Sequence, residues 1–197
     1  MNYLEKINEL IRQQNGTILS SDLDKHGIPR VFLQRLMIEG QIERYGRGIY
    51  VAVDAIEDEM FAMQKKYTKL IYSHETALYM HDLSDRTPFE YSVTVPSGYK
   101  VVPNVADRFK VYYVKKELHE LGVVSVKNSF GNQIKVYNIE RTICDIIKSR
   151  SRIDIQILNE ALRRFVRMKS ADYSALMNYA KKLNIEIIVK HYLEVIL

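Results

Sequence analysis

The sequence predicts an α+β fold with an N-terminal helical part closed by a hairpin and a mixed part that ends in several helices. Two observations predict it. Within residues 1–40, apolar residues recur at three- and four-residue spacing, and directly after Gly40 they alternate with polar ones. Beyond residue 90, several alternating runs come before a helical pattern that continues to the end of the chain. We therefore expect two domains, residues 1–52 and residues 53–197.

The first helix is predicted from Leu4, Ile7 and Ile11, which fall on one face at helical spacing. Asn15 and Gly16 follow. Both residue types tolerate the left-handed backbone that ends many helices, so we expect the helix to stop there.

Two further helices are predicted before residue 41. Ser20 or Ser21 is expected to cap a short second helix, and Gly27 supplies a tight exit from it. Pro29 suits the first turn of a third helix, "PRVFLQRLMIE", which is expected to end at Gly40.

A hairpin is predicted after the third helix. Ile42 and Arg44 stand against Ile49 and Val51, with "YGRG" between them. Helix, short helix, turn, helix and hairpin is the order of a winged helix-turn-helix. The stretch "ERYGRGIY", residues 43–50, is therefore predicted to be the wing.

The remainder is predicted to be mixed. A connecting helix is expected at "VDAIEDEMFAMQKKY", whose charges change from acidic to basic along its length, and another helix at "SHETALYMHDL". Strands are expected at "EYSVTVP", "FKVYYV", "VVSVK" and "QIKVYNI". Helices follow from Ile139, with breaks near residues 149–153, 168–170 and Asn184. In the first of them we expect Asn138 to cap the helix and Arg141 to pair with Asp145.

The third helix presents two different faces on a helical wheel. Leu33, Leu36 and Met37 fall on one side, with Phe32 at its edge, and are expected to pack inward. The other side carries Arg30, Val31, Gln34, Arg35 and Ile38. Arginine can bridge guanine O6 and N7, glutamine can pair with adenine, and valine can meet a thymine methyl group. We expect this face to read DNA in the major groove, and the alternative is a solvated surface helix.

The predicted wing adds Arg44, Tyr45 and Arg47 to this surface. A short hairpin tip of this kind can place guanidinium groups against phosphates or in the minor groove. Its alternative interpretation is a solubilising turn.

The charge is unevenly distributed along the chain. The net charge is +5, and residues 141–197 hold 11 lysines and arginines against 6 acidic residues. Arg163, Arg164 and Arg167 share one face of a helix there. The opposite face is apolar and carries Ile155, Leu158, Leu162, Phe165 and Val166. The arginine face is either a further DNA-binding patch or a solvated surface.

Signatures of enzymes and of metal sites are missing from the sequence. It has no Gly-x-Ser-x-Gly, P-loop, Gly-x-Gly-x-x-Gly or HExxH motif, and no Asp/Glu-x-Lys triplet of the usual metal-dependent nuclease core. His74 and His81 are seven residues apart, too far along a helix to hold one ion easily, and are interpreted as surface histidines. Cys144 stands beside isoleucines as an apolar thiol. We expect no enzyme, no cofactor and no metal.

Export and membrane insertion are not indicated either. There is no 18-residue apolar run, and the first residues lack the basic and apolar regions of a secretory signal. We expect a cytoplasmic protein that does not bind a membrane.

Three blocks of the sequence carry a resemblance to a known family. They are "GTILSSDLDKHGIPRVFLQRLMIEGQIERYGRGIY", "SHETALYMHDLSDRTPFEYSVTVPSGY" and "YNIERTICDIIKSRSRID". With them the chain resembles the AbiEi family of antitoxins and transcriptional regulators, from type IV toxin–antitoxin and abortive-infection (phage defence) systems. The resemblance covers nearly the whole chain.

The resemblance implies a transcriptional autorepressor that is also an antitoxin. Its winged helix would bind double-stranded DNA at inverted repeats in its own promoter, with Arg30, Gln34 and Arg35 as readers and Arg44, Tyr45 and Arg47 in the wing. Its C-terminal domain would neutralise a toxin similar to nucleotidyltransferases, without a stable complex. The chain has no Gly-Ser dipeptide, which that transferase class requires, and so corresponds to the antitoxin half.

Two other functions stay open at the level of sequence. One is a winged-helix regulator whose C-terminal domain binds a small ligand and has no toxin partner. The other is an enzyme, such as a nuclease, with a DNA-binding head.

Overall fold

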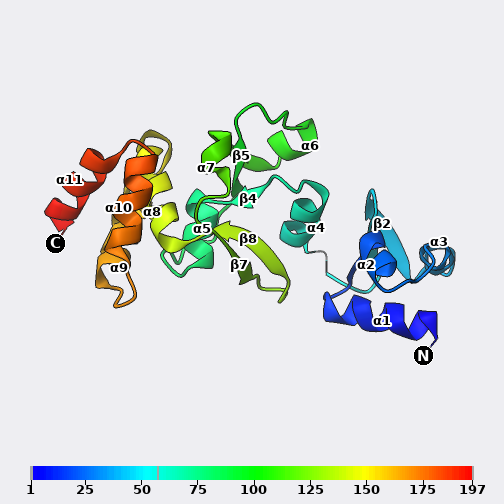
Figure 1. Ribbon diagram of the computed structural model, residues 1–197. Helices are drawn as coiled ribbons and strands as arrows, with labels where there is room; N and C mark the ends of the chain where they lie inside the picture. Colours follow the sequence, from blue (N-terminus) through cyan, green and yellow to red (C-terminus); the bar gives the residue numbers. More distant parts are fainter. Residues whose placement is uncertain (1, 57, 197) are drawn as a thin grey trace. The chain divides into compact units, whose positions relative to one another are not determined.

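The protein is described here by a computed structural model of residues 2–56 and 58–196 (Figure 1). Its contacts divide the chain into an N-terminal unit, Met1–Thr68 with Lys127–Ile134, and a C-terminal unit, Lys69–Val126 with Lys135–Leu197. The division therefore lies beyond the predicted boundary at Ala52, because a further helix packs within the N-terminal unit. Independent folding of residues 1–52 stays a prediction.

The N-terminal unit has the order of elements that the sequence predicts for a winged helix-turn-helix. Its elements are α1 (Tyr3–Gln13), β1 (Thr17–Leu19), α2 (Ser20–Lys25), α3 (Val31–Ile38), β2 (Ile42–Gly46), β3 (Ile49–Ala52) and α4 (Glu59–Lys66). The fold class is α+β, as predicted, with α2 and α3 as the helix-turn-helix and β2–β3 as the wing.

The core of this unit is formed by the inner faces of its helices. Ile7 of α1, Leu23 of α2 and Leu33 and Leu36 of α3 are buried together. Met37 and Phe32 are half-buried against the same cluster. The predicted inward face of α3 is thus confirmed, and burial of these side chains fixes which residues α3 presents outward.

A short strand before α2 was not predicted. β1 pairs with β3, Thr17 opposite Val51, so that the sheet has the order β1-β3-β2. The predicted serine caps of α2 are wrong, because the helix already begins at Ser20. Instead the carboxylate of Asp22 accepts a hydrogen bond from the N–H of Leu19, at 3.2 Å.

The C-terminal unit is built on a sheet with the strand order β6-β5-β4-β8-β7. Its strands are β4 (Ile71–Tyr72), β5 (Tyr91–Pro96), β6 (Phe109–Val114), β7 (Val123–Lys127) and β8 (Gln133–Tyr137). β4 runs antiparallel to β5 and parallel to β8, and β5 runs parallel to β6. Each of the four predicted strands is present.

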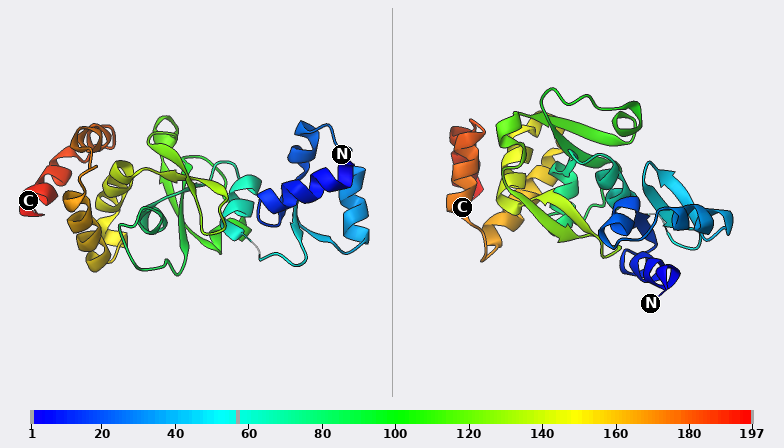
Figure 2. Two further views of the ribbon diagram at one scale, coloured as in Figure 1. Left: turned by 90° about the horizontal axis from the view of Figure 1, so that it is seen from below. Right: turned by 45° about the vertical axis from the view of Figure 1, so that its right-hand side comes forward.

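Helices complete the unit. They are α5 (His74–Met80), α6 (Pro103–Ala106), α7 (Lys116–His119), α8 (Ile139–Lys148), the 3₁₀ helix η1 (Arg150–Arg152), α9 (Ile155–Arg167), α10 (Tyr173–Lys182) and α11 (Glu186–Ile196). Of these, α5, α6 and α7 contact the sheet. The three predicted breaks after Ile139 fall where α8, α9 and α10 end. Figures 1 and 2 show α8–α11 grouped together within the unit.

Helix α8 lies at the centre of this group. All residues from 141 to 147 are buried, and α8 packs against α5, α9 and α10. Leu158, Leu162 and Phe165 of α9 join its isoleucines in one apolar cluster. Among the described helices, none combines the length and the apolar character needed to cross a membrane.

Candidate nucleic-acid interface

The outward face of α3 is solvent-exposed, as predicted. Val31 and Ile38 are 60% and 86% exposed, and Gln34 is exposed between them. Exposure of these side chains leaves the outward face of α3 open to a partner. Val31 and Gln34 together offer a methyl contact and a bidentate amide.

Arg30 is tied to α2 across the turn. Its Nε donates to Asp24 Oδ1 at 2.9 Å, and its Nη2 donates to the second carboxylate oxygen. The hydrogen bond from Arg30 lowers the pKa of Asp24. Both nitrogens on this edge of the guanidinium are therefore engaged within the protein, and Arg30 is less available as a base reader than its neighbours.

Arg35 is engaged differently. Only its Nε donates to a carboxylate, Glu39 Oε1 at 2.7 Å, and the side chain is 59% exposed. Its two terminal nitrogens have no hydrogen-bond partner in the part of the chain that the structure describes. These two groups match the O6 and N7 acceptors of guanine, so Arg35 keeps the geometry needed for bidentate recognition.

The wing is a hairpin with an irregular register. Arg44 stands opposite Tyr50, Gly46 stands opposite Ile49, and the register shifts between Arg44 and Gly46. Arg44 Nε lies 3.3 Å from Gly46 O, and Arg47 is exposed at the tip. The tip thus presents two guanidinium groups close together in sequence.

Gly48 anchors this tip to α2. Its backbone has φ +73°, and its carbonyl accepts the N–H of Ser20 at 2.8 Å. A side-chain carbon at position 48 would lie 2.6 Å from Ser20 Oγ, which is too close for real atoms. Ser20, predicted as a helix cap, therefore holds the wing through its backbone N–H, and the positive φ at position 48 favours glycine.

Tyr45 is turned toward the protein. It is half-buried and packs against Leu19, Ile49 and Ala62. Its position fixes the inner side of the wing, and its predicted contact with DNA stays a prediction.

With this geometry established, the chain can be compared with known proteins. Residues 5–53 match the family model described as "Transcriptional regulator, AbiEi antitoxin". The predicted AbiEi resemblance is confirmed over these residues, which we call the AbiEi segment. The segment contains most of α1, together with α2, α3 and the wing.

A solved structure extends the likeness of fold beyond the AbiEi segment. The crystal structure of the RV2827C protein from Mycobacterium tuberculosis is similar with a TM-score of 0.60 and 10% sequence identity. The match covers 91% of this chain and 71% of that one. At this identity the likeness shows the fold alone. No curated protein matches the sequence.

Outside the AbiEi segment, the three predicted arginines of α9 differ from one another. Arg164 Nη1 donates to Asp85 Oδ1 at 3.0 Å and Nη2 donates to Glu160 Oε1 at 2.6 Å. Arg164 thus joins α9 to the loop after α5 and is occupied by carboxylates. Arg163 and Arg167 are exposed, and no ion pair involves them in the described residues. A DNA-binding role for this face stays a prediction.

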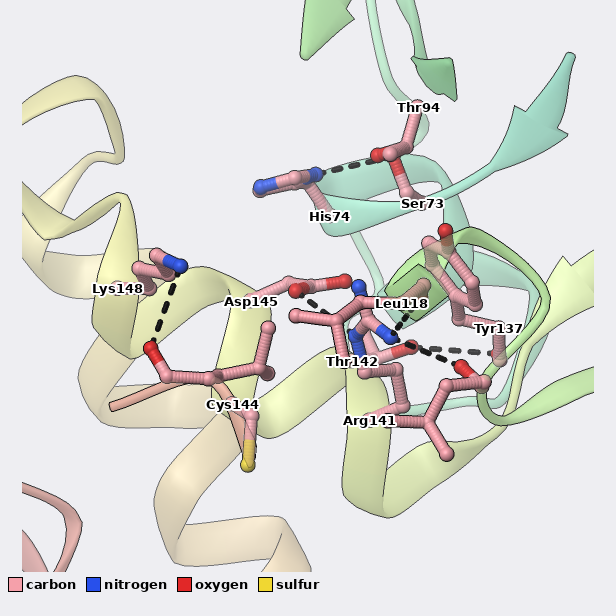
Figure 3. A network of polar contacts seen from close by, with 12 residues as sticks. Ser73, His74, Thr94, Leu118, Tyr137, Arg141, Thr142, Cys144, Asp145 and Lys148 are labelled. Atoms are coloured by element: carbon pink, nitrogen blue, oxygen red, sulfur yellow. Dashed lines mark hydrogen bonds and ion pairs between the residues drawn. The ribbon is translucent and has the colours of Figure 1, made fainter. Parts of the chain in front are cut away.

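The block "ERTICDIIK" forms a buried polar network rather than a surface (Figure 3). The predicted cap and ion pair are both present: Asn138 accepts the N–H of Arg141 at 3.0 Å, and Arg141 Nε donates to Asp145 Oδ1 at 3.0 Å. Arg141 is fully buried, with its guanidinium 4.3 Å from the ring centre of Tyr137. Its Nη1 donates to the carbonyls of Leu118 and Leu121, both at 2.9 Å.

Burial controls the protonation of this network. It raises the pKa of Asp145, an effect that the charge of Arg141 opposes. Burial also raises the pKa of Cys144 to about 12, so the thiol stays protonated at neutral pH. The prediction of an inert, apolar thiol is consistent with this environment.

The interpretation of His74 as a surface histidine is wrong. His74 is 3% exposed, has φ +49°, and stacks on Tyr112 with 3.4 Å between ring centres. Its Nδ1 lies 2.9 Å from Ser73 Oγ and its Nε2 lies 3.1 Å from Ser149 Oγ. Burial lowers its pKa well below the ordinary value, which makes the ring neutral.

His81 is also partly enclosed. It is half-buried, and its Nε2 lies 2.7 Å from the carbonyl oxygen of Tyr137. Burial lowers its pKa. No group of three or more potential metal ligands is found among the described residues.

Proposed function

We propose that this protein is a DNA-binding transcriptional autorepressor and the antitoxin of a type IV toxin–antitoxin system. One observation carries the proposal: the AbiEi segment presents Val31, Gln34 and Arg35 on an exposed face, with Arg44 and Arg47 on the wing of the same unit. The matched family is described as a transcriptional regulator and antitoxin. Autorepression and the type IV mechanism go beyond that description.

DNA recognition follows from the different surroundings of the basic residues. In our proposal α3 enters the major groove, where Gln34 pairs with adenine and Arg35 offers its terminal nitrogens to guanine. Arg47 contacts phosphate, which fixes orientation without reading sequence. Arg30 contributes once it exchanges Asp24 for DNA, an exchange that costs little because exposed ion pairs contribute little free energy.

Repression requires binding at the promoter. We propose that the DNA sites are inverted repeats upstream of the chain's own operon, so that bound protein excludes transcription. Footprinting on that upstream DNA tests this half of the proposal. We expect protection of paired sites by the wild type and its loss in the variant Gln34→Ala with Arg35→Ala. Absence of any protected sequence would contradict the repressor function.

The antitoxin activity is assigned to the C-terminal unit. We propose that it counteracts a nucleotidyltransferase-like toxin in the cytoplasm without a stable complex, as part of defence against phage, and that it does so without catalysis of its own. Co-expression with the toxin encoded beside it tests this half: cell growth should be rescued, and the two proteins should not co-purify. Failure to rescue would leave a regulator without antitoxin activity.

A further inference from the structure

The side chain of Lys66, the last residue of α4, lies against the wing. A side-chain carbon at position 46 would lie 3.4 Å from Lys66 Cδ and 3.6 Å from Lys66 Nζ. On the same residue, Gly46 O lies 3.3 Å from Arg44 Nε. The backbone of Gly46 is thus flanked by two cationic side chains, one from the wing and one from a helix outside the AbiEi segment.

Helix α4 is held firmly in this place. Ala62 is completely buried against Leu19 of β1 and Ile49 of β3, so the middle of the helix is packed on the wing sheet. At its first turn, Asp58 Oδ1 accepts the N–H of Phe61 at 3.0 Å. Lys66 therefore projects from a rigid element and not from a loose linker.

The segment from residues 127–134 strengthens this anchor. Asn128 Nδ2 donates to both carboxylate oxygens of Asp58, at 2.8 and 2.7 Å, and Asn132 Nδ2 donates to one of them at 2.8 Å. Asp58 is 1% exposed. A buried carboxylate satisfied by several donors fixes the start of α4, and with it the direction of the whole helix.

The charges at the wing are not balanced by the protein itself. Lys25, Arg30 and Arg35 each pair with a carboxylate. By contrast, no carboxylate pairs with Arg44, Arg47 or Lys66 within residues 2–56 and 58–196. Lys66 and Arg47 are exposed, so their charges face solvent and its counterions.

We propose that Lys66 is a DNA-phosphate contact, and that Arg44, Arg47 and Lys66 form one phosphate-binding surface that we call the wing–α4 surface. This proposal rests on the proposed DNA binding. It extends the DNA-binding surface from the winged helix to α4, which lies outside the AbiEi segment. Cations that pair with no carboxylate among the described residues attract phosphates, and their binding releases counterions condensed on the DNA. Because phosphates are present in every sequence, Lys66 contributes affinity without base preference.

The test compares Lys66→Ala with Lys65→Ala in the full-length protein. Lys65 is the adjacent residue on α4, and both lysines are exposed with Nζ over an aromatic ring, 5.0 Å from the centre of Phe61 for Lys65 and 5.4 Å from the centre of Tyr67 for Lys66. They differ at the wing, where the atoms nearest to a side-chain carbon at position 46 all belong to Lys66. The two variants remove the same charge from the same helix. Dissociation constants are measured for a labelled duplex of mixed sequence over a range of salt concentrations, with Arg47→Ala as the positive control.

We expect Lys66→Ala to reduce the slope of log affinity against log salt by about 0.9, as Arg47→Ala should. The ratio of the wild-type affinity to the Lys66→Ala affinity should therefore fall about threefold as the salt concentration rises from about 50 to 200 mM. Lys65→Ala should keep the wild-type slope. Lys66→Arg should restore it, and Lys66→Gln should repeat the loss, which separates a charge effect from damage to α4.

Other outcomes overturn specific parts of the proposal. A wild-type slope in Lys66→Ala beside a reduced slope in Arg47→Ala would overturn the role of Lys66 and leave DNA binding intact. Equal reductions of the salt slope in Lys65→Ala and Lys66→Ala would also overturn the role of Lys66, because its position beside Gly46 would then make no difference. A wild-type protein without salt-dependent binding would overturn the proposed function itself.

Discussion

Arg30 and Asp24 form a two-pronged ion pair that joins the residue before α3 to α2 across the turn of the helix-turn-helix. The pair links the two sides of the turn and engages a guanidinium that the sequence predicts to contact DNA. Phosphate or base must replace Asp24 before Arg30 can contact DNA on this edge. Asp24 therefore competes with DNA for Arg30, and its removal measures that competition.

Replacing Asp24 by Asn should raise DNA affinity. The substitution releases Arg30 and also removes a negative charge beside the recognition helix, so the salt dependence of binding should steepen. Asp54→Asn is the matched control, because it removes one exposed carboxylate of the same unit without releasing Arg30. Titration of both variants with labelled upstream DNA makes the comparison. Equal gains in both variants would mean that net charge alone acts.

Arg35 and Arg47 should contribute to binding in different ways. Arg35→Ala is expected to cost about 1–3 kcal/mol on the preferred sequence and to relax discrimination against mutated sites. Arg47→Ala should weaken binding to all sequences alike and reduce the salt slope by about one. Competition titrations with matched and mismatched duplexes separate the two effects. Unchanged affinity in both variants would remove α3 and the wing from the interface.

Gly48→Ala should destabilise the N-terminal unit more than Gly40→Ala. Both glycines have positive φ, +73° and +68°, so both substitutions carry the strain of a left-handed residue, about 1–2 kcal/mol. Only at position 48 would the added carbon also collide with Ser20, since nothing lies within 4 Å at position 40. Thermal unfolding measures the difference. The double variant Gly48→Ala with Ser20→Gly should recover the part that comes from the collision.

Acid should destabilise the C-terminal unit through His74. The pKa of His74 in the folded protein lies well below the unfolded value of 6.5. Below about pH 6.5, His74 therefore binds a proton in the unfolded chain but not in the folded protein. This contribution to stability is complete above pH 6.5 and declines by up to about 1.4 kcal/mol per pH unit as the pH falls toward the folded pKa. Urea unfolding at several pH values should show a shallower decline for His74→Gln. If stability declined equally with pH in the wild type and in His74→Gln, other groups, His81 among them, would control the loss of stability in acid.

Removing residues 1–52 should leave a folded fragment that cannot repress. The C-terminal unit has its own sheet and buried helices, so the fragment 53–197 should unfold cooperatively on heating. It should rescue cells from the partner toxin at least in part, provided that the toxin does not act through the operator. In the fragment 53–197, Ala62 of α4 loses its packing partners Leu19 and Ile49. The fragment 69–197 avoids this exposure because it also lacks α4. Aggregation of both fragments would show that the two parts do not fold separately.

Local pattern in the sequence was sufficient for most elements of the fold. The spacing of Leu33 and Leu36 gave the inward face of α3, and alternation gave the wing and four strands of the larger sheet. β1 and β4, of three and two residues, are too short for any period to appear. Their existence depends on partners distant in sequence, as with Thr17 opposite Val51.

The surroundings of charged side chains were the least predictable part of the candidate site. Arg35 and Arg164 are equally basic residues on helices. Two nitrogens of Arg35 have no hydrogen-bond partner among the described residues, whereas Arg164 is bound by Asp85 and Glu160. Nothing in sequence spacing places Asp85 beside Arg164. His74 likewise reads as a polar helix residue, and its burial depends on Tyr112 and Ser149, which tertiary packing brings to it.

The inclusion of residues 127–134 in the N-terminal unit has a consequence for biosynthesis. Asp58 accepts side-chain amide hydrogen bonds from Asn128 and Asn132, which leave the ribosome long after α4. At about 5–20 residues per second, synthesis from Thr68 to Ile134 takes about 3–13 s, during which the nascent N-terminal unit is incomplete. A polypeptide that ends before Asn128 would therefore lack the side chains that hold Asp58, and with them the fixed starting point of α4.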